Sequence, residues 1–220
     1  VFGFLGPNGA GKTTTMYALL GFIVPTGGEA FLFGKDVRHS IARRRIGYLP
    51  EPPDTYRFLT GFELLQTTGH MFSMSGAGLR KRIAEVLAMV DMTEPAQRRI
   101  GTYSRGMMQR ICLAQALLND PDLVIMDEPT SGLDPFGRAR IRSIIADLRD
   151  RGKTVFFSSH ELSEVELVCD TLAILAGGRM IMEGPVSGMV KPGENLERFF
   201  MRTVTEDRNA GDASARGGRP

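Results

Sequence analysis

Short apolar runs, separated by longer segments of helical spacing, mark most of the chain. Four of these runs, residues 1–5, 46–49, 123–126 and 154–157, read VFGFL, IGYL, LVIM and TVFF. Nearly continuous apolar runs of this length are typical of buried strands in a parallel sheet, because helices cover both of its faces. The pattern therefore predicts an α/β core.

Helices and further strands are expected between and after these runs. Residues 14–20 and 135–149 are predicted helices, and the second carries its isoleucines on one face. Residues 29–33 suit a short additional strand, and residues 171–175 and 180–182 suit a final hairpin.

Residues 59–118 differ from the rest, because strand-like runs vanish and apolar residues recur at helical spacing. One amphipathic helix is marked by Leu79, Ile83, Val86, Leu87 and Val90. The predicted fold is an α/β core with a mostly parallel sheet, residues 1–58 and 119–190, and an inserted α-helical subdomain at 59–118. Residues 204–220 are poor in apolar side chains and are expected to form a disordered tail.

The composition limits the class of protein. The 220 residues, 42% hydrophobic and 24% charged, suffice for one well-buried globular domain. A formal net charge of +2 gives no support to nucleic-acid binding. Cys112 and Cys169 form no C-x-x-C pair, which speaks against a metal site or a disulfide scaffold. No apolar run approaches the length of a bilayer, so we expect any membrane to be reached through a partner.

A glycine-rich segment follows the first predicted strand. Residues 6–13 read GPNGAGKT, which matches the pattern G-x-x-x-x-G-K-[ST], and a predicted helix begins directly afterwards. The glycines let backbone N–H groups point inward, and the helix adds the positive end of its dipole, so that a polyphosphate can bind. Lys12 supplies a cation for the outer phosphates, and the hydroxyl of Thr13 is a candidate magnesium ligand. The alternative is a plain glycine-rich turn, and the preceding strand argues against it.

Ionisable side chains follow two later strands. Asp127 and Glu128 come directly after residues 123–126, and His160 follows the strand that contains residues 154–157. Ligands of parallel sheets gather at the carboxyl ends of the strands, so these side chains are expected near the phosphates. Phosphoryl transfer needs a metal clamp and a residue that orients the nucleophile, and carboxylates suit both roles.

Five segments in this order resemble the nucleotide-binding domain of the ABC ATPase superfamily. They are GPNGAGKT at 6–13, YSRGMMQR at 103–110, Asp127-Glu128, SGLD at 131–134 and His160. The resemblance covers residues 1–203 and implies a P-loop NTPase core. Relative to the family, the sequence begins partway through the domain. We therefore expect upstream strands, and the residue that stacks on adenine, to lie outside it.

ATP and Mg²⁺ are the ligands that the resemblance implies. Phosphate binding falls to Gly6, Pro7, Asn8, Gly9, Ala10, Gly11, Lys12, Thr13 and Thr14. Lys12 is assigned to the β- and γ-phosphates, and Asp127 joins Thr13 in the magnesium environment. Glu128 is assigned to polarise the attacking water, and His160 to contact the γ-phosphate.

Ser104, Gly106 and Asp134 are assigned by the same resemblance to the nucleotide of a second subunit. For Ser104 a plain helix N-cap is the alternative, and both roles can hold at once. One chain then carries two half-sites and no complete site. Hydrolysis consequently requires a head-to-tail dimer, either a homodimer or a pair with another ATPase subunit.

Two departures from the family pattern stand out. The signature, usually LSGGQ, reads YSRGM at residues 103–107, which resembles a subgroup of bacterial exporter ATPases. Glu51 stands where the family usually has glutamine. We expect Glu51 to approach the magnesium ion or its water, and to link the site to the helical subdomain.

The function indicated is the ATP-binding and hydrolysing subunit of an ABC transporter, with export favoured by the signature. The protein is expected at the cytoplasmic face of the cell membrane, bound to a separate transmembrane permease through residues 51–74.

Two alternative functions are weaker. A soluble ABC ATPase acting on nucleic acid or ribosomes usually has tandem domains or a long coiled coil, and neither is seen in this sequence, so we predict no nucleic-acid partner. A non-hydrolysing nucleotide-gated regulator is opposed by the presence of Lys12, Asp127, Glu128 and His160.

Overall fold

The computed structural model describes residues 1–189 and 195–216. Its main sheet has six strands in the order β4-β5-β6-β1-β7-β8. These strands are β1 (Phe2–Leu5), β4 (Ile46–Leu49), β5 (Leu123–Met126), β6 (Thr154–Ser159), β7 (Thr171–Ala176) and β8 (Arg179–Pro185). β7 and β8 pair antiparallel, and the other neighbouring strands of this sheet pair parallel. The mostly parallel α/β fold predicted from the apolar runs is confirmed.

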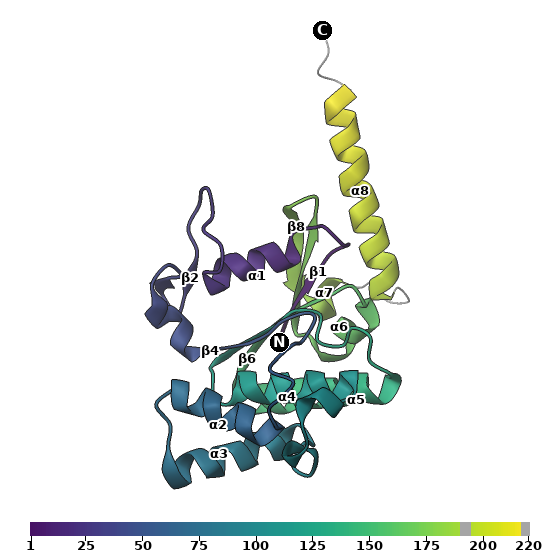
Figure 1. Cartoon of the computed structure of the whole chain (residues 1–220). Coiled ribbons are helices and arrows are strands. Elements are labelled where there is room, and N and C mark those ends of the chain that lie inside the picture. The colour runs from purple at the N-terminus through teal and green to yellow at the C-terminus, as the bar shows by residue number, and fades with distance from the viewer. Residues whose placement is uncertain (190–194, 217–220) are drawn as a thin grey trace.

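Helices cover both faces of this sheet. They include α1 (Lys12–Leu20), α4 (Arg105–Leu117), α5 (Pro135–Asp150) and α6 (Leu162–Val168), whereas α2 (Gly61–Met71) and α3 (Gly76–Met89) pack with α4. In β5, Ile125 packs with Met16 of α1, whereas Val124 and Met126 belong to the larger core that includes α4 and α5. Figure 1 shows α1 on one side of the strands and α4 and α5 on the other. Alternate residues of the strand therefore serve different helices.

The register of the parallel strands aligns their carboxyl ends. Leu5 at the end of β1 pairs with Ser159 at the end of β6, and Met126 at the end of β5 pairs with Leu49 at the end of β4. The loops after β1, β4, β5 and β6 consequently leave the sheet at one edge, where ligands of parallel sheets bind.

The strand expected at residues 29–33 is shorter than predicted and does not belong to the main sheet. β2 (Phe31–Leu32) pairs antiparallel with β3 (Lys35–Asp36) in a separate two-stranded sheet. The chain reverses between them because Phe33 and Gly34 have positive φ angles of 53° and 72°. A 3₁₀ helix, η1 (Ser40–Arg45), leads into β4.

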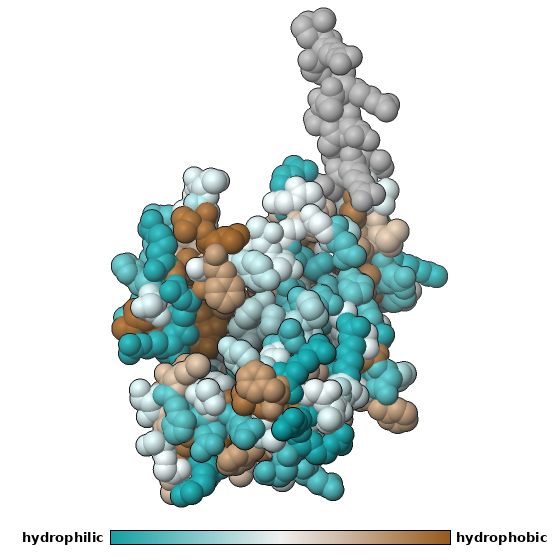
Figure 2. Space-filling model, in the orientation of Figure 1, coloured by the Kyte–Doolittle hydropathy of each residue, from teal (hydrophilic) through white to brown (hydrophobic). Residues whose placement is uncertain are grey.

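Hydrophobic side chains are exposed around this small sheet. Figure 2 shows hydrophobic surface over the α1 and β2 region of Figure 1. Exposed large apolar side chains in these segments are Phe22, Ile23, Val24, Phe31 and Phe33.

Residues 59–118 hold the helices α2, α3 and α4 and the 3₁₀ helices η2 (Pro95–Gln97) and η3 (Ile100–Thr102). α2 begins with a capping box, in which Thr60 accepts from the Glu63 N–H and the Glu63 side chain accepts from the Thr60 N–H. The apolar face predicted for α3 is buried, whereas Met71, the last residue of α2, is 77% exposed.

Gly47 allows β4 and α4 to approach closely. A Cβ atom at this position would lie 2.1 Å from the carbonyl oxygen of Ala116, a backbone atom that a rotamer change does not move. We expect Gly47→Ala to lower the free energy of unfolding by about 1–3 kcal/mol, the usual cost of overpacking a core. Gly27→Ala is the control, because no atom lies within 4 Å of its Cβ position. Equal denaturation midpoints for the two variants would contradict this reading of the contact.

The disordered tail expected at residues 204–220 is helical as far as the structure describes it. After α7 (Val186–Met189), α8 runs from Leu196 to Arg216, and Figure 1 shows it extending away from the sheet. Its first turns are anchored by the buried side chains of Leu196, Phe199 and Val204. Extending an anchored helix costs far less than starting one, which explains helix in a segment of such polar composition. Residues 217–220 lie outside the described residues.

Both cysteines are free and buried, and burial raises the pKa of the Cys112 and Cys169 thiols to about 12. They are therefore unsuited to act as nucleophiles near neutral pH. In the described ranges, none of the helices has both the length and the apolar content needed to span a bilayer.

Candidate functional site

The loop between β1 and α1 forms a cradle at the edge of the sheet. Gly9 and Gly11 have φ angles of 79° and 103°, and Lys12 begins α1. A Cβ atom at Gly6 would lie 2.5 Å from the Leu175 carbonyl oxygen, so only glycine fits there. The first N–H groups of a helix have no partner within the helix, which makes the start of α1 a donor surface for an anion.

Lys12 is 7% exposed, and its ammonium lies back over the loop. It donates to the carbonyl oxygens of Gly6 at 2.7 Å and Pro7 at 3.4 Å. Its Nζ also lies 3.5 Å from Glu128 Oε1. The lysine expected to bind the outer phosphates thus adjoins the carboxylate expected to act on water.

A cavity of about 300 Å³ opens above this cradle. Its lining consists of Asn8, Gly9, Ala10, Gly11, Lys12, Thr13, Thr14, Glu51 and Glu128. Nearly all the residues expected to bind phosphate therefore share one cavity, and Glu51 enters it from the loop after β4.

Thr13 and Asp127 meet beside this cavity although 114 positions separate them in the sequence. The Thr13 hydroxyl donates to Asp127 Oδ2 at 2.7 Å, and Asp127 is only 2% exposed. The Ser158 hydroxyl donates to the other carboxylate oxygen of Asp127 at 2.5 Å and accepts from the Glu128 N–H at 2.9 Å. Ser158 was not among the predicted site residues, and its place at the end of β6 was the only signal for it.

This pair of oxygen donors fits a magnesium ion that shares its coordination with phosphate. Mg²⁺ is usually held by one or two carboxylates together with substrate phosphates and water, and rarely by a cage of protein ligands alone. Within residues 1–189 and 195–216 no group of three or more His, Cys, Asp and Glu side chains is placed to hold a metal.

Glu128 and His160 form the second pair at the sheet edge. Glu128 Oε2 lies 2.7 Å from His160 Nδ1 and 3.3 Å from the His160 backbone nitrogen. Glu128 is 7% exposed and has a positive φ of 46°, a conformation that is uncommon for a residue other than glycine. Such strained positions persist where the surroundings enforce them, often at functional sites.

Glu51 is exposed, and no hydrogen bond or ion pair of its side chain is found in the described parts of the chain. The structure therefore places Glu51 at the phosphate cavity, and in the described residues its side chain forms no hydrogen bond with Thr13 or Asp127. Its predicted role toward magnesium stays a prediction.

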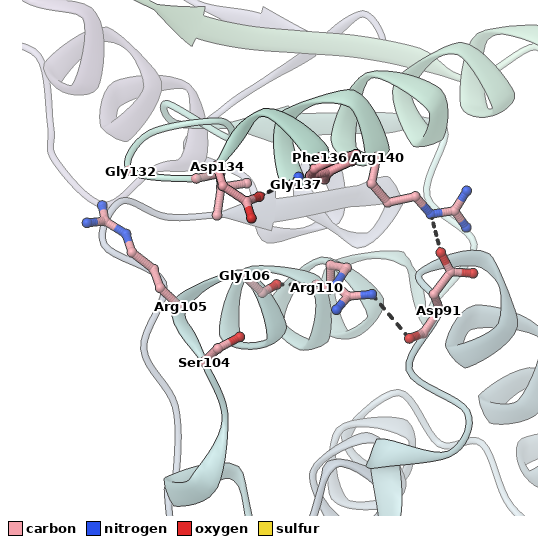
Figure 3. A pocket seen from close by; sticks show the side chains of 11 residues that line it. Asp91, Ser104, Arg105, Gly106, Arg110, Gly132, Asp134, Phe136, Gly137 and Arg140 are labelled. Atoms are coloured by element: carbon pink, nitrogen blue, oxygen red, sulfur yellow. Dashed lines mark hydrogen bonds and ion pairs between the residues drawn. The ribbon is translucent and has the colours of Figure 1, made fainter.

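The signature residues line a different cavity, of about 540 Å³. Figure 3 shows Ser104 and Gly106 at the start of α4, and Asp134 and Gly137 at the start of α5. Ser104 caps α4 by accepting from the Met107 N–H at 3.3 Å, so the alternative of an N-cap is realised. Asp134 caps α5 by accepting from the Gly137 N–H at 2.7 Å.

Arginines surround this signature cavity. The Arg105 guanidinium lies against Gly132, where a Cβ atom would come within 2.2 Å of it, and Figure 3 shows it pointing away from the cavity's other arginines. Arg140 pairs with the Asp91 carboxylate at 2.6 Å, and Arg110 donates to the Asp91 carbonyl oxygen at 3.2 Å. These contacts were not predictable from the sequence, because they join segments far apart in the chain.

The two cavities share no lining residue. Lys12, Thr13, Glu51 and Glu128 line the phosphate cavity, whereas Ser104, Gly106 and Asp134 line the signature cavity. Within one chain the structure does not bring the two predicted groups together.

Comparison with known proteins shows extensive similarity in sequence. A family model described as ABC transporter matches residues 1–131. An uncharacterized ABC transporter ATP-binding protein of Nostoc sp. is 46% identical over 86% of this chain. A Nod factor export ATP-binding protein of Paraburkholderia xenovorans is 41% identical over 86% of the chain. A fluoroquinolones export ATP-binding protein of Mycobacterium tuberculosis is 39% identical over 82% of it. The matches span 57%, 63% and 60% of these relatives' own lengths.

Solved structures of similar shape agree with these relatives. An ATP-binding subunit of an ABC transporter superposes with a TM-score of 0.82 at 28% identity, covering 92% of this chain and 87% of that one. A dimeric ATP-binding cassette in a post-hydrolysis state, bound to ADP and Pi, superposes with a TM-score of 0.76 at 27% identity, covering 85% of each chain.

Proposed function

The chain belongs to the ABC transporter family, and we propose that it is a subunit that hydrolyses Mg-ATP in a head-to-tail dimer to drive transport through a separate membrane subunit. The observation that carries this proposal is the division of the site residues between two cavities of one chain. A dimer in which each phosphate cavity faces the partner's signature cavity completes two sites. A structural relative that is a dimer bound to ADP and Pi supports the formation of a dimer.

In this proposal the phosphate cavity binds the triphosphate through the N–H groups that open α1 and through Lys12. Thr13 and Asp127 would hold Mg²⁺, which when bound neutralises charge on the phosphate oxygens. Ser158 fixes the Asp127 carboxylate by donating to Oδ1, so that Oδ2 remains directed at Thr13.

Glu128 would accept a hydrogen bond from the attacking water and take up its proton. The carboxylate is held by His160 on Oε2 and lies 3.5 Å from Lys12 through Oε1. Because it is 7% exposed, little bulk water competes for it. The water oxygen bonds to the γ-phosphorus as the bond to the β-phosphate oxygen breaks, giving ADP and phosphate.

The proposed permease contact is the surface that follows β4. Between residues 51 and 74 the exposed apolar side chains are Tyr56, Phe58, Met71 and Phe72. The rings of Tyr56 and Phe58 lie next to each other, with centroids 5.9 Å apart, and exposed aromatic side chains suit a protein partner. We place the chain at the cytoplasmic face of the membrane, bound through this surface. Export is the favoured direction, because relatives 39–41% identical carry export in their names.

Glu51 is proposed to link the phosphate cavity to this surface. We expect Glu51→Gln to raise the Mg²⁺ concentration for half-maximal hydrolysis by about tenfold, the lower end of the effect of losing an outer partner of a metal site. The measurement is phosphate release from Mg-ATP by the full chain, purified and in native membranes, over a magnesium titration.

The matched control is Glu94→Gln, which neutralises an exposed carboxylate outside both cavities. Superimposable titrations for Glu51→Gln and the unmodified protein, with the same rate in native membranes, would refute the proposed role of Glu51. Absence of phosphate release from the unmodified protein in both settings would count against the ATPase itself.

A further inference from the structure

One arginine connects the loop that lines the signature cavity to the loop that carries His160. Arg138 lies in the second turn of α5 and is 31% exposed at its side chain. Its Nε donates to the Leu133 carbonyl oxygen at 3.0 Å. Its Nη1 donates to the carboxylate of Glu161, a residue that is 24% exposed at its side chain.

Each end of this connection adjoins a proposed functional residue. Leu133 immediately precedes Asp134 at the signature cavity, and Glu161 immediately follows His160. The Glu161 backbone is itself fixed, because its N–H donates to the Ser159 hydroxyl at 2.9 Å. A displacement of the Leu133 carbonyl is therefore transmitted through one guanidinium to the segment that places His160.

The geometry makes this connection stiff. The guanidinium is planar and holds its donors in a fixed fork, so a group bonded at Nε and one bonded at Nη1 keep their relative position. The bond to the Glu161 carboxylate is charge-assisted, and both side chains are partly buried, which reduces screening by solvent. His160 in turn bonds the Glu128 carboxylate at 2.7 Å, which completes a path from the signature cavity to the residue proposed to act on water.

We propose that Arg138 is a positioning residue that couples contact with the second subunit to the placement of His160 and Glu128. The proposal rests on the dimeric ATPase function proposed above. Arg138 lines neither cavity. Its backbone N–H donates to the Asp134 carbonyl oxygen at 3.0 Å at the start of α5, and its side chain reaches the two loops through Leu133 and Glu161. When a partner chain fixes the loop at residues 131–134, Arg138 fixes residues 159–161 as well, so that hydrolysis follows assembly of the dimer.

A second ion pair, which joins α5 to α6, allows coupling to be distinguished from simple stabilisation. Arg142 lies four residues further along α5 and donates to both carboxylate oxygens of Glu164, at 2.7 and 2.8 Å. Glu164 is 6% exposed, so this pair is more buried than the Arg138 pair. It joins α5 to α6 but contacts neither loop. A role limited to fastening α5 to α6 therefore predicts that loss of Arg142 is at least as harmful as loss of Arg138.

The experiment compares Arg138→Gln, Arg142→Gln and Arg138→Lys in the full chain, with kcat, KM for ATP and the midpoint of thermal unfolding as readouts. We expect Arg138→Gln to lower kcat about tenfold with KM within about twofold, because misplacement of a catalytic group by a fraction of an ångström has effects of this size. Arg142→Gln should lower the unfolding midpoint at least as far and leave kcat within about twofold. Arg138→Lys should recover only part of kcat, since one ammonium lacks the fork that spans both acceptors.

Glu161→Gln serves as a second variant that removes the charge of the pair and retains the bond to Leu133. A kcat for Arg138→Gln and Glu161→Gln equal to that of Arg142→Gln would overturn the proposal. The proposal would also be overturned if the fall in kcat were proportional to the fall in the unfolding midpoint across all the variants. Failure of the proposed function is recognised separately, because the unmodified protein would then release no phosphate.

Discussion

Glu128→Gln is expected to lower the rate of ATP hydrolysis on the order of 100-fold or more, the contribution typical of a general base. The amide keeps the size of the carboxylate and an oxygen that can accept from His160, but it cannot take up a proton from water. Nucleotide binding should be retained, because the groups proposed to bind phosphate are Lys12 and the N–H groups at the start of α1. Loss of the negative charge 3.5 Å from Lys12 Nζ leaves that ammonium more available to phosphate.

The measurement is phosphate release under single-turnover conditions, with the dissociation constant for ATP determined in parallel. Glu166→Gln is the control, because Glu166 is an exposed carboxylate on α6. Hydrolysis by Glu128→Gln within about tenfold of the unmodified rate would show that another group accepts the proton.

Ser104→Arg is expected to reduce hydrolysis by a comparable factor, on the order of 100-fold, while ATP binding to the separate chain is unchanged. Ser104 lines the signature cavity and not the phosphate cavity, so a bulky side chain there cannot reach the nucleotide of its own chain. It can only obstruct the nucleotide that a second chain presents to it.

The variant Ser104→Asp distinguishes loss of the α4 N-cap from obstruction of the partner's nucleotide. Aspartate is as good an N-cap as serine, so the helix is kept, but its charge would face the γ-phosphate of the partner's ATP. If Ser104 serves only as the N-cap that accepts from Met107, this variant should hydrolyse ATP normally. If Ser104 faces nucleotide, Ser104→Asp should be as inactive as Ser104→Arg.

Mixing the two inactive variants tests the composite site within one sample. A dimer of Ser104→Arg with Glu128→Gln contains one site with both defects and one site with none, because each site takes Glu128 from one chain and Ser104 from the other. Hydrolysis should therefore reappear on mixing. A mixture as inactive as its components would show that Ser104 and Glu128 do not belong to complementary halves.

The fold was predictable where the apolar pattern of a short segment is enough to identify it as a strand. Residues 46–49 and 123–126 are continuous apolar runs, and both form buried strands of the main sheet. Residues 29–33 have the same apolar character, yet only Phe31 and Leu32 pair, and they pair with β3. Whether a strand joins the main sheet depends on which other strands it can pair with. Those strands lie elsewhere in the sequence, so the segment alone does not reveal it.

At residues 204–216 the composition predicted less regular structure than the chain has. The polar composition of this segment predicts disorder, but helix formation requires only a start, and the buried side chains of Leu196 and Phe199 supply it at the first turn of α8. Composition describes the segment alone, whereas the anchor is a tertiary contact.

For the candidate site, the rule that ligands gather at the carboxyl ends of parallel strands was sufficient to expect Asp127, Glu128 and His160 beside the glycine-rich loop. The structure places Asp127 against Thr13 and Glu128 against Lys12, and His160 contacts Glu128. Ser158 and Arg138 were not predictable, because serine at a strand end and arginine on a helix are ordinary. Their importance comes from distances of 2.5 Å to Asp127 and 3.0 Å to Leu133, which only the folded chain sets.

The solution mass of the Glu128→Gln variant, with and without Mg-ATP, is the most direct test of the proposal that two chains close around two ATP molecules. We predict a monomer without nucleotide and a dimer with Mg-ATP, since the variant binds ATP but does not consume it. Addition of Ser104→Arg should return the mass to that of a monomer. A monomer in Mg-ATP, with ATP binding demonstrated on the same sample, would contradict the composite site as a property of this chain.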